Sequence, residues 1–153
     1  MISLKKILYP TDFSEFSLCA MPYALELSRH FESELHCLHV VEPSYMDSML
    51  AAETHEQTML DQMGAIRQRM KEFEDEYLKD DRVRVVSKVV SGHPFEQIIG
   101  YARDQEIDLI IMATHGHGAL SSMLLGSITE KVVRKSPCPI MTVRHPEHEF
   151  VMP

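Results

Sequence analysis

Residues 109–118 read Leu109-Ile110-Ile111-Met112-Ala113-Thr114-His115-Gly116-His117-Gly118. The first five are apolar without alternation, which is typical of a central strand of a parallel sheet, because helices cover both faces of such a strand. The glycines that follow let a main chain approach a ligand closely and expose successive N–H groups. The stretch therefore predicts a buried parallel strand that runs into a loop suited to an anion.

Four other short apolar runs predict the remaining strands: Lys6–Tyr9, Leu35–Val41, Val83–Val90 and Ile140–Val143. Helical periodicity fills the gaps and predicts helices over Leu18–Phe31, Met59–Tyr77, Pro94–Ala102 and Ser127–Lys135. Pro22 is expected to kink the first helix or delay its start. Strands that alternate with helices imply right-handed crossovers. The sequence thus predicts an α/β fold, a Rossmann-like five-stranded parallel sheet with helices on both faces.

Composition places the chain among soluble globular proteins. Its 153 residues are 44% hydrophobic and 25% charged. With no internal repeat or linker, we expect one domain over residues 1–145 and a polar tail over residues 146–153. The longest apolar run, Leu109–Ala113, is far too short to span a membrane. The net charge of −8 argues against nucleic acid as a partner, because nucleic-acid-binding proteins usually carry a basic face.

Two further features bear on location. The N-terminus shows no apolar export signal. The three cysteines lie far apart and are odd in number, which fits reduced thiols better than a disulfide framework. We therefore expect a cytoplasmic protein.

Ligands of open parallel sheets bind beyond the carboxyl ends of strands, where the strand order reverses. Asp12 follows the first strand and suits a ribose or a metal, while Ser14 suits a helix N-cap. Gly126-Ser127 opens the last helix, where N–H groups and the positive dipole end attract anions. Ser127 and Glu130 also match a capping box, so a purely structural role for Ser127 stays open.

Several motifs together resemble the universal stress protein family. They are Ile7-Leu8-Tyr9-Pro10-Thr11-Asp12-Phe13-Ser14, His39-Val40, the run from Ala113 to Gly116, Gly126-Ser127 and Pro137-Cys138-Pro139-Ile140. The resemblance covers essentially the whole chain. It implies a five-stranded parallel sheet of the adenine nucleotide alpha hydrolase-like type, which is often dimeric and in many members binds ATP.

The ATP-binding pattern of that family is Gly, two residues, Gly, nine residues, Gly, then Ser or Thr. Gly116, Gly126 and Ser127 match it, but the first position is Ala113. If φ at Ala113 is negative the methyl group costs little, whereas a positive φ would cost about 1 kcal/mol. By this resemblance Asp12 meets the ribose and the Val40 main chain meets the adenine. The implied nucleotide-binding residues are Pro10, Thr11, Asp12, Val40, Met112, Ala113, His115, Gly116, Gly126, Ser127, Ile128 and Thr129.

The segment from Ala113 to Glu130 contains no Lys or Arg. A P-loop NTPase places a lysine on the phosphates, so here main-chain dipoles and a nucleotide-borne Mg²⁺, which Asp12 could contact, must offset their charge. We therefore predict an ATP binder with slow or no hydrolysis, and no catalytic residues. A zinc site is disfavoured because His36 and His39 project to opposite faces of a strand.

Three functions remain open from the sequence. The leading one is an ATP-binding regulatory protein of the stress response. The second is an interaction module with a vestigial nucleotide site, and the third is an enzyme acting on an adenylated or phosphorylated small molecule. The edge strand Ile140–Val143 predicts a homodimer through that strand. The methionines, several of them between Met59 and Met70, are expected to fill the core, while a mobile, Met-rich lid or partner surface over Tyr45–Leu60 stays open as an alternative.

Overall fold

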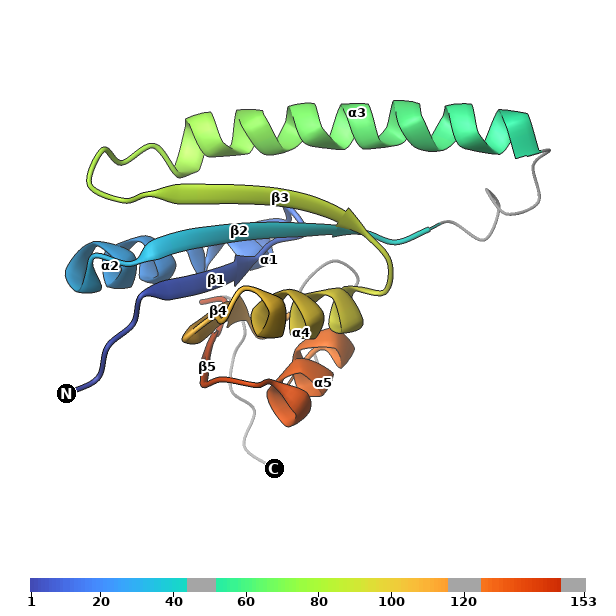
Figure 1. Cartoon of the computed structure of the whole chain (residues 1–153). Coiled ribbons are helices and arrows are strands. Elements are labelled where there is room, and N and C mark those ends of the chain that lie inside the picture. The colour runs from blue at the N-terminus through green and yellow to red at the C-terminus, as the bar shows by residue number, and fades with distance from the viewer. Residues whose placement is uncertain (44–51, 116–124, 147–153) are drawn as a thin grey trace.

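The computed structural model describes residues 1–43, 52–115 and 125–146. The elements are β1 (Lys6–Pro10), α1 (Glu15–Leu18), α2 (Met21–Phe31), β2 (Glu34–Val41), α3 (Ala52–Tyr77), β3 (Val85–Ser91), α4 (Pro94–Asp104), β4 (Leu109–Ala113), α5 (Ser127–Lys135) and β5 (Ile140–Val143). All four strand pairs are parallel, in the order β3-β2-β1-β4-β5. The predicted fold class is confirmed, and Figure 1 shows helices on both faces of the sheet.

The apolar run 109–113 forms a central strand, as predicted. Ile110 and Ile111 are both fully buried, on opposite faces of β4. Ile111 joins the core under α2 and α3, which includes Met70 and Phe73. Ile110 joins the core under α4 and α5, which includes Val132. Two helical layers therefore cover this strand, which explains why its sequence does not alternate.

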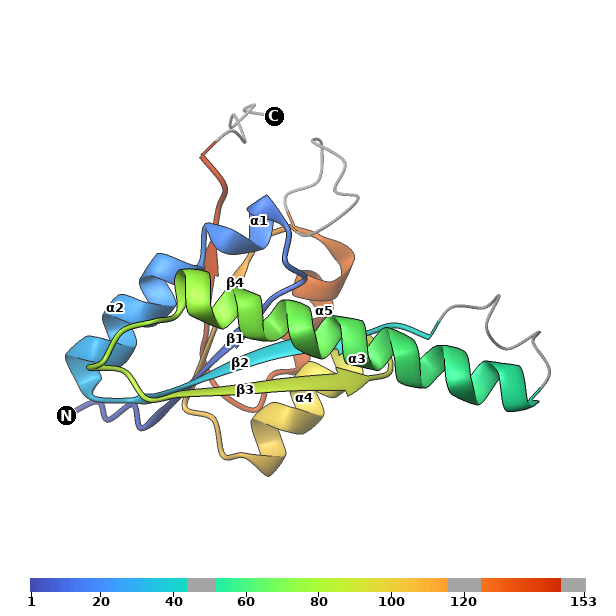
Figure 2. The ribbon, with the colours of Figure 1, turned by 90° about the horizontal axis from the view of Figure 1, so that it is seen from above.

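Proline places two of the helix starts. α2 begins at Met21 with Pro22 in its first turn, so the predicted delay occurs and a separate short α1 precedes it. α4 begins at Pro94, as predicted. α3 begins at Ala52, earlier than the predicted Met59, and its N-terminal half extends past the ends of β2 and β3 (Figures 1 and 2).

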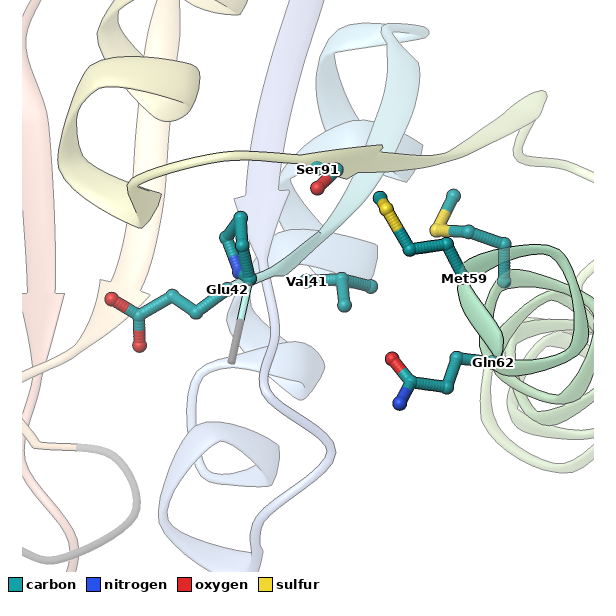
Figure 3. Close-up of a pocket in the computed structure, with 7 residues that line it drawn as sticks. Val41, Glu42, Met59, Gln62 and Ser91 are labelled. Carbon is teal, nitrogen blue, oxygen red and sulfur yellow. The ribbon is translucent and has the colours of Figure 1, made fainter. Parts of the chain in front are cut away.

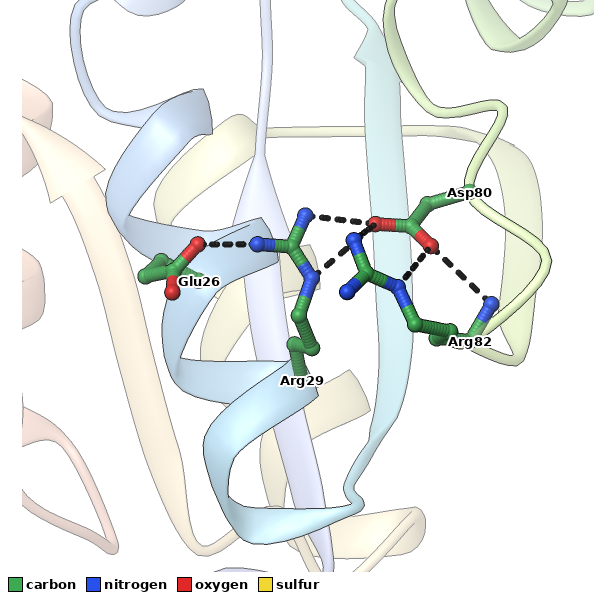
Figure 4. Close-up of polar contacts among 4 residues, drawn as sticks. All are labelled: Glu26, Arg29, Asp80 and Arg82. Atoms are coloured by element: carbon green, nitrogen blue, oxygen red, sulfur yellow. Dashed lines mark hydrogen bonds and ion pairs between the residues drawn. The ribbon is translucent and has the colours of Figure 1, made fainter.

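A network of charged side chains closes the turn between α3 and β3 (Figure 4). Asp80 accepts hydrogen bonds from Arg29 Nε at 3.1 Å and from the Arg82 main-chain N–H at 3.0 Å. Arg29, in the last turn of α2, also pairs with Glu26. The Arg29 guanidinium holds the pKa of Asp80 well below its usual range. This network ties α2 to the turn at the amino ends of the strands.

The strand order reverses between β1 and β4. From β1 the chain moves outward through β2 to the edge strand β3, and then crosses to β4 and the other edge, β5. Such a reversal leaves an opening at the carboxyl ends of the two strands beside it. No helix in the described part of the chain is long and apolar enough to span a membrane.

Candidate nucleotide-binding site

The sheet brings the predicted site segments together at one edge. Pro10 of β1 pairs with Leu38 of β2, and Leu8 pairs with Ile110 of β4. Continuing this second register sets the end of β1 beside the end of β4. The segments that follow β1 and β4, together with the end of β2, therefore lie at the predicted switch point.

The turn after β1 is held by its own side chains. Asp12 Oδ1 accepts hydrogen bonds from the Ser14 main-chain N–H at 3.0 Å and from its hydroxyl at 2.5 Å. Ser14 Oγ in turn accepts from the Ser17 N–H at 3.1 Å, so Ser14 is the N-cap of α1, as predicted. Asp12 therefore uses one carboxylate oxygen, Oδ1, to hold the turn together. The same residue is the one predicted to meet the ribose.

Thr11 is committed to the protein interior. It is buried, its N–H donates to the Leu38 carbonyl at 2.9 Å, and its Oγ1 lies 3.0 Å from Ser17 Oγ. The same Oγ1 accepts from the Phe13 N–H at 3.0 Å. The Thr11 side chain thus holds the turn in place. Pro10, also buried, lies before it at the end of β1.

The start of α5 differs from the capping box that the sequence suggested. Gly126 is the N-cap, with φ −65° and ψ 154°, and no side chain caps the helix. The capping-box prediction for Ser127 is wrong because the Gly126 N–H donates to the Thr114 carbonyl at 2.7 Å, which places Ser127 inside the first turn. Glu130 instead pairs with Arg134 at 2.8 Å.

At this helix start, three main-chain N–H groups precede the first hydrogen bond of the helix. The first α5 main-chain hydrogen bond runs from the Glu130 N–H to the Gly126 carbonyl at 2.9 Å. The N–H groups of Ser127, Ile128 and Thr129 therefore precede the ladder at the positive end of the helix dipole. Ser127 and Ile128 are exposed. This geometry suits an anion such as phosphate.

Glycine is favoured at position 126 because the Thr114 carbonyl lies close to it, and not because of its backbone angles. Its φ is negative, contrary to the general expectation that loop glycines supply positive φ. A Cβ there would lie 3.2 Å from the Thr114 carbonyl oxygen, tighter than an ordinary contact. Any larger residue would press on the strand end that carries the site.

The Ala113 departure from the family pattern is harmless to the backbone. Positive φ among described non-glycine residues occurs at Phe13, Glu32 and Glu106, and not at Ala113. Ala113 ends β4 with its side chain buried in the α2 and α3 core. Its carbonyl accepts from Thr129 Oγ1 at 3.1 Å. The buried Thr129 hydroxyl is thus used inside the protein, and its main-chain N–H is the group placed to meet a phosphate.

Other predicted residues line the same edge or lie outside the described chain. Met112 is buried and Val40 half-buried on the α4 and α5 side. His115 is buried, with Nδ1 3.0 Å from Thr114 Oγ1. Gly116 lies outside the described residues, as do most of the loop to Gly126 and nearly all of the predicted tail.

The sequence did not mark Phe13 and His39 as parts of the site, yet both contact the turn that carries Asp12. His39 Nδ1 lies 2.8 Å from the Thr11 carbonyl, and its ring stacks on Phe13 with centroids 4.2 Å apart. Burial lowers the pKa of His39, although the bond to Thr11 opposes this. No sequence signal gave the contact of Phe13 with β2, because His39 is distant from it in the chain.

The two histidines of β2 project to opposite faces, as predicted. His36 Nδ1 lies 2.8 Å from Tyr101 Oη of α4, whereas His39 contacts the turn after β1. Within the described residues, no three His, Cys, Asp or Glu side chains group as a metal site requires.

A small hollow opens between the end of β2 and α3 (Figure 3). Its lining is largely apolar and contains no positively charged side chain. The lining residues are Val41, Glu42, Pro43, Met59, Gln62, Met63 and Ser91. Successive strand residues alternate between faces, so Val41 turns towards α3 while Val40 turns towards α4. The hollow is therefore distinct from the predicted phosphate site.

Comparison with known proteins identifies the family. The profile of the universal stress protein family matches residues 3–144. Universal stress proteins MJ0531 and MJ0577 of Methanocaldococcus jannaschii are each 31% identical to this chain, over 95% and 94% of it and over 85% and 96% of their own lengths. The solved structure of MJ0577 matches with a TM-score of 0.77 at 32% identity, covering 95% of this chain and 99% of that one.

Two structures with the same fold were solved with an adenine nucleotide. A universal stress protein in complex with cAMP matches with a TM-score of 0.70 at 19% identity, covering 94% of this chain and 98% of that one. An Arabidopsis thaliana universal stress protein family member with AMP bound matches with a TM-score of 0.60 at 16% identity, covering 94% and 93%. The profile match, the sequence relatives and the shared fold agree: the chain belongs to the universal stress protein family.

Proposed function

We propose that this protein binds ATP, with Mg²⁺, at the carboxyl ends of β1, β2 and β4, and acts as a nucleotide-dependent regulatory protein of the stress response. One observation carries the proposal: the start of α5 has no side-chain cap and lies at the same sheet edge as the Asp12 turn. The N–H groups of Ser127, Ile128 and Thr129 would hold the phosphates. Asp12 would meet the ribose, and the Val40 main chain the adenine.

Main-chain groups and a cation would offset the phosphate charge. The segment from Ala113 to Glu130 supplies no Lys or Arg. A fixed lysine or arginine on the transferred phosphate is a large part of phosphoryl-transfer catalysis. Its absence favours a protein that holds ATP and hydrolyses it slowly or not at all.

The cAMP and AMP complexes show that two proteins of the same fold bind adenine nucleotides. At 19% and 16% identity they show a shared fold and no more, so the case for this chain depends on its own residues. The backbone at Ala113 weakens the alternative of a vestigial site, because the alanine fits its strand conformation without strain.

Calorimetric titration of the purified protein with ATP and Mg²⁺ tests the proposal. Gly126→Val should weaken binding at least tenfold, because its side chain would meet the Thr114 carbonyl at the start of α5. Gly64→Val is the matched control, since a Cβ at Gly64 meets nothing within 4 Å. Asp12→Ala should also weaken binding. Absence of binding by the unaltered protein would leave the interaction module with a vestigial site.

Slow hydrolysis has its own measurement. Phosphate release in the steady state should stay far below the roughly 1 per second at which ordinary enzymes begin. Turnover at or above that rate would contradict the assignment as a nucleotide binder without enzymatic activity.

A homodimer through β5 completes the proposal. β5 is an edge strand, and Ile140 and Met141 on it are only half-buried. An apolar edge favours pairing with another chain. Light scattering at micromolar concentration should give twice the chain mass. Thr142→Glu, at an exposed position of β5, should reduce the measured mass to that of a single chain. A monomeric mass for the unaltered protein would refute the dimer.

A further inference from the structure

Phe13 adopts a backbone conformation that its side chain disfavours. Its φ is 62°, in the left-handed region. Gly, Asn and Asp visit this region readily, whereas a bulky residue there is an outlier that its surroundings must hold. Phe13 directly follows Asp12, so the contacts that hold Phe13 also hold the main chain of the turn in which Ser14 orients the Asp12 carboxylate.

Contacts from two other elements hold the Phe13 ring. The His39 ring of β2 stacks on it at 4.2 Å with an interplanar angle of 26°. Phe73 of α3 meets it edge-on at 5.4 Å, and the Arg69 guanidinium lies 4.9 Å from its centroid. The Phe13 N–H also donates to Thr11 Oγ1 at 3.0 Å.

His39 also holds the residue on the other side of Asp12. Its Nδ1 lies 2.8 Å from the Thr11 carbonyl oxygen, which can only accept, so Nδ1 carries the proton and donates. His39 therefore fixes residue 11 by a hydrogen bond and residue 13 by stacking. Asp12 lies between these two contacts.

We infer that His39 is a positioning residue for Asp12 and sets its contact with the ribose of the bound nucleotide. This inference rests on the proposed ATP site and adds a residue to it. His36 provides the contrast: it lies on the same strand and contacts Tyr101 of α4 through the same ring atom, Nδ1. Of these two histidines, His39 is the one that contacts the turn carrying Asp12.

The test compares Mg²⁺-ATP with Mg²⁺-2′,3′-dideoxy-ATP, which lacks both ribose hydroxyls. Titrations would use the unaltered protein, His39→Leu, His39→Asn and His36→Leu, each checked for folding by its thermal transition. The unaltered protein should bind ATP about tenfold more tightly than the dideoxy nucleotide, the size of one hydrogen bond to a charged group.

His39→Leu should lose this preference. Its affinity for ATP should fall about tenfold, while its affinity for the dideoxy nucleotide should change less than about twofold. His39→Asn should keep part of the preference, because its amide can still donate to the Thr11 carbonyl. His36→Leu should keep the full preference even if its thermal transition falls.

The possible failures are distinguishable. An unaltered protein that binds neither nucleotide overturns the proposed function and this inference together. An unaltered protein that binds both equally, a His39→Leu protein with the full preference, or equal weakening of both nucleotides by that change would overturn the inference alone. Equal weakening would show that His39 serves stability and not the position of Asp12.

Discussion

Two helices begin at the same edge of the sheet, and their first turns are completed in opposite ways. α1 is capped by Ser14, whose hydroxyl accepts from the Ser17 N–H at 3.1 Å. α5 begins after Gly126 and has no side-chain cap. The protein thus satisfies one helix start itself and leaves the other with donors for a ligand. The difference separates a residue that supports stability from residues that we propose bind the nucleotide.

An acidic cap on α5 would remove the difference between the two helix starts, and we expect it to have the largest effect on ATP binding. Gly126→Asp would place a carboxylate where we expect phosphate, and its Cβ would press on the Thr114 carbonyl. Losing charge-assisted hydrogen bonds of about 1.5–3 kcal/mol predicts a fall in ATP affinity of roughly ten- to a hundredfold. Calorimetry would measure it, with Gly126→Ala as a control for the steric part. Equal effects of both changes would show that charge at the helix start is irrelevant.

Removal of the α1 cap should have a smaller effect, and on another property. Ser14→Ala deletes the acceptor for the Ser17 N–H and one of the donors to Asp12. We expect a loss of about 1 kcal/mol in the free energy of unfolding. For a chain of this size that lowers Tm by about 2–4 °C. Urea unfolding and thermal melting would measure it. Unchanged stability would show that the Ser14 cap contributes nothing.

The same comparison shows where prediction from sequence succeeded and failed. The bounds of β4, α5 and β5 were predicted as observed, because an unbroken apolar run defines β4, and Gly126, Pro137 and Pro139 flank α5 and β5. The cap of α5 was misplaced because a tertiary hydrogen bond to Thr114, twelve residues away, decides it. The extension of α3 to Ala52 was missed because that part of the helix extends past the sheet, where no periodic apolar face is needed.

Within the site, sequence similarity and physics contributed different parts. The family pattern identified both segments that the structure brings to one edge, but it gave no conformation for Ala113 and no role for Phe13. Both depend on backbone angles, which follow from packing between segments distant in sequence. His39 could not be assigned to the turn because its partner, Thr11, is 28 residues away.

Restoration of the family glycine should change little. Ala113→Gly removes a buried methyl group from a strand whose φ is already ordinary, so ATP affinity should change less than about twofold. Stability should fall by up to about 1 kcal/mol, because glycine adds backbone entropy to the unfolded chain. Parallel titration and urea unfolding would measure both. A large gain in ATP affinity would instead show that Ala113 obstructs the nucleotide.

Lowering the pH should reduce the free energy of unfolding through His39, which contacts the turn before α1, and also through His36. Burial lowers the pKa of both side chains below their ordinary value of 6.5. The unfolded chain therefore binds more protons than the native state once the pH falls below about 6.5. The free energy of unfolding should be nearly constant between pH 8 and pH 6.5, fall as the pH passes from 6.5 through each native pKa, and then level off. Asp80 does not contribute in this window, because its carboxyl is ionised in the unfolded chain, where its pKa lies near 3.8, and also in the native state, where Arg29 lowers that pKa further.

Urea unfolding between pH 8 and pH 5 would measure this loss. His39→Asn should remove the His39 part of the pH dependence and leave that of His36, and His36→Leu should do the reverse. The asparagine keeps a donor for the Thr11 carbonyl but loses the ring that stacks on Phe13, so its free energy of unfolding above pH 7 should lie below that of the unaltered protein. A free energy of unfolding that rises on acidification would mean that the native state favours a charged imidazole at these positions. The Nδ1 donor to the Thr11 carbonyl would then belong to a charged imidazole, and the assignment of a neutral His39 beside the Asp12 turn would be wrong.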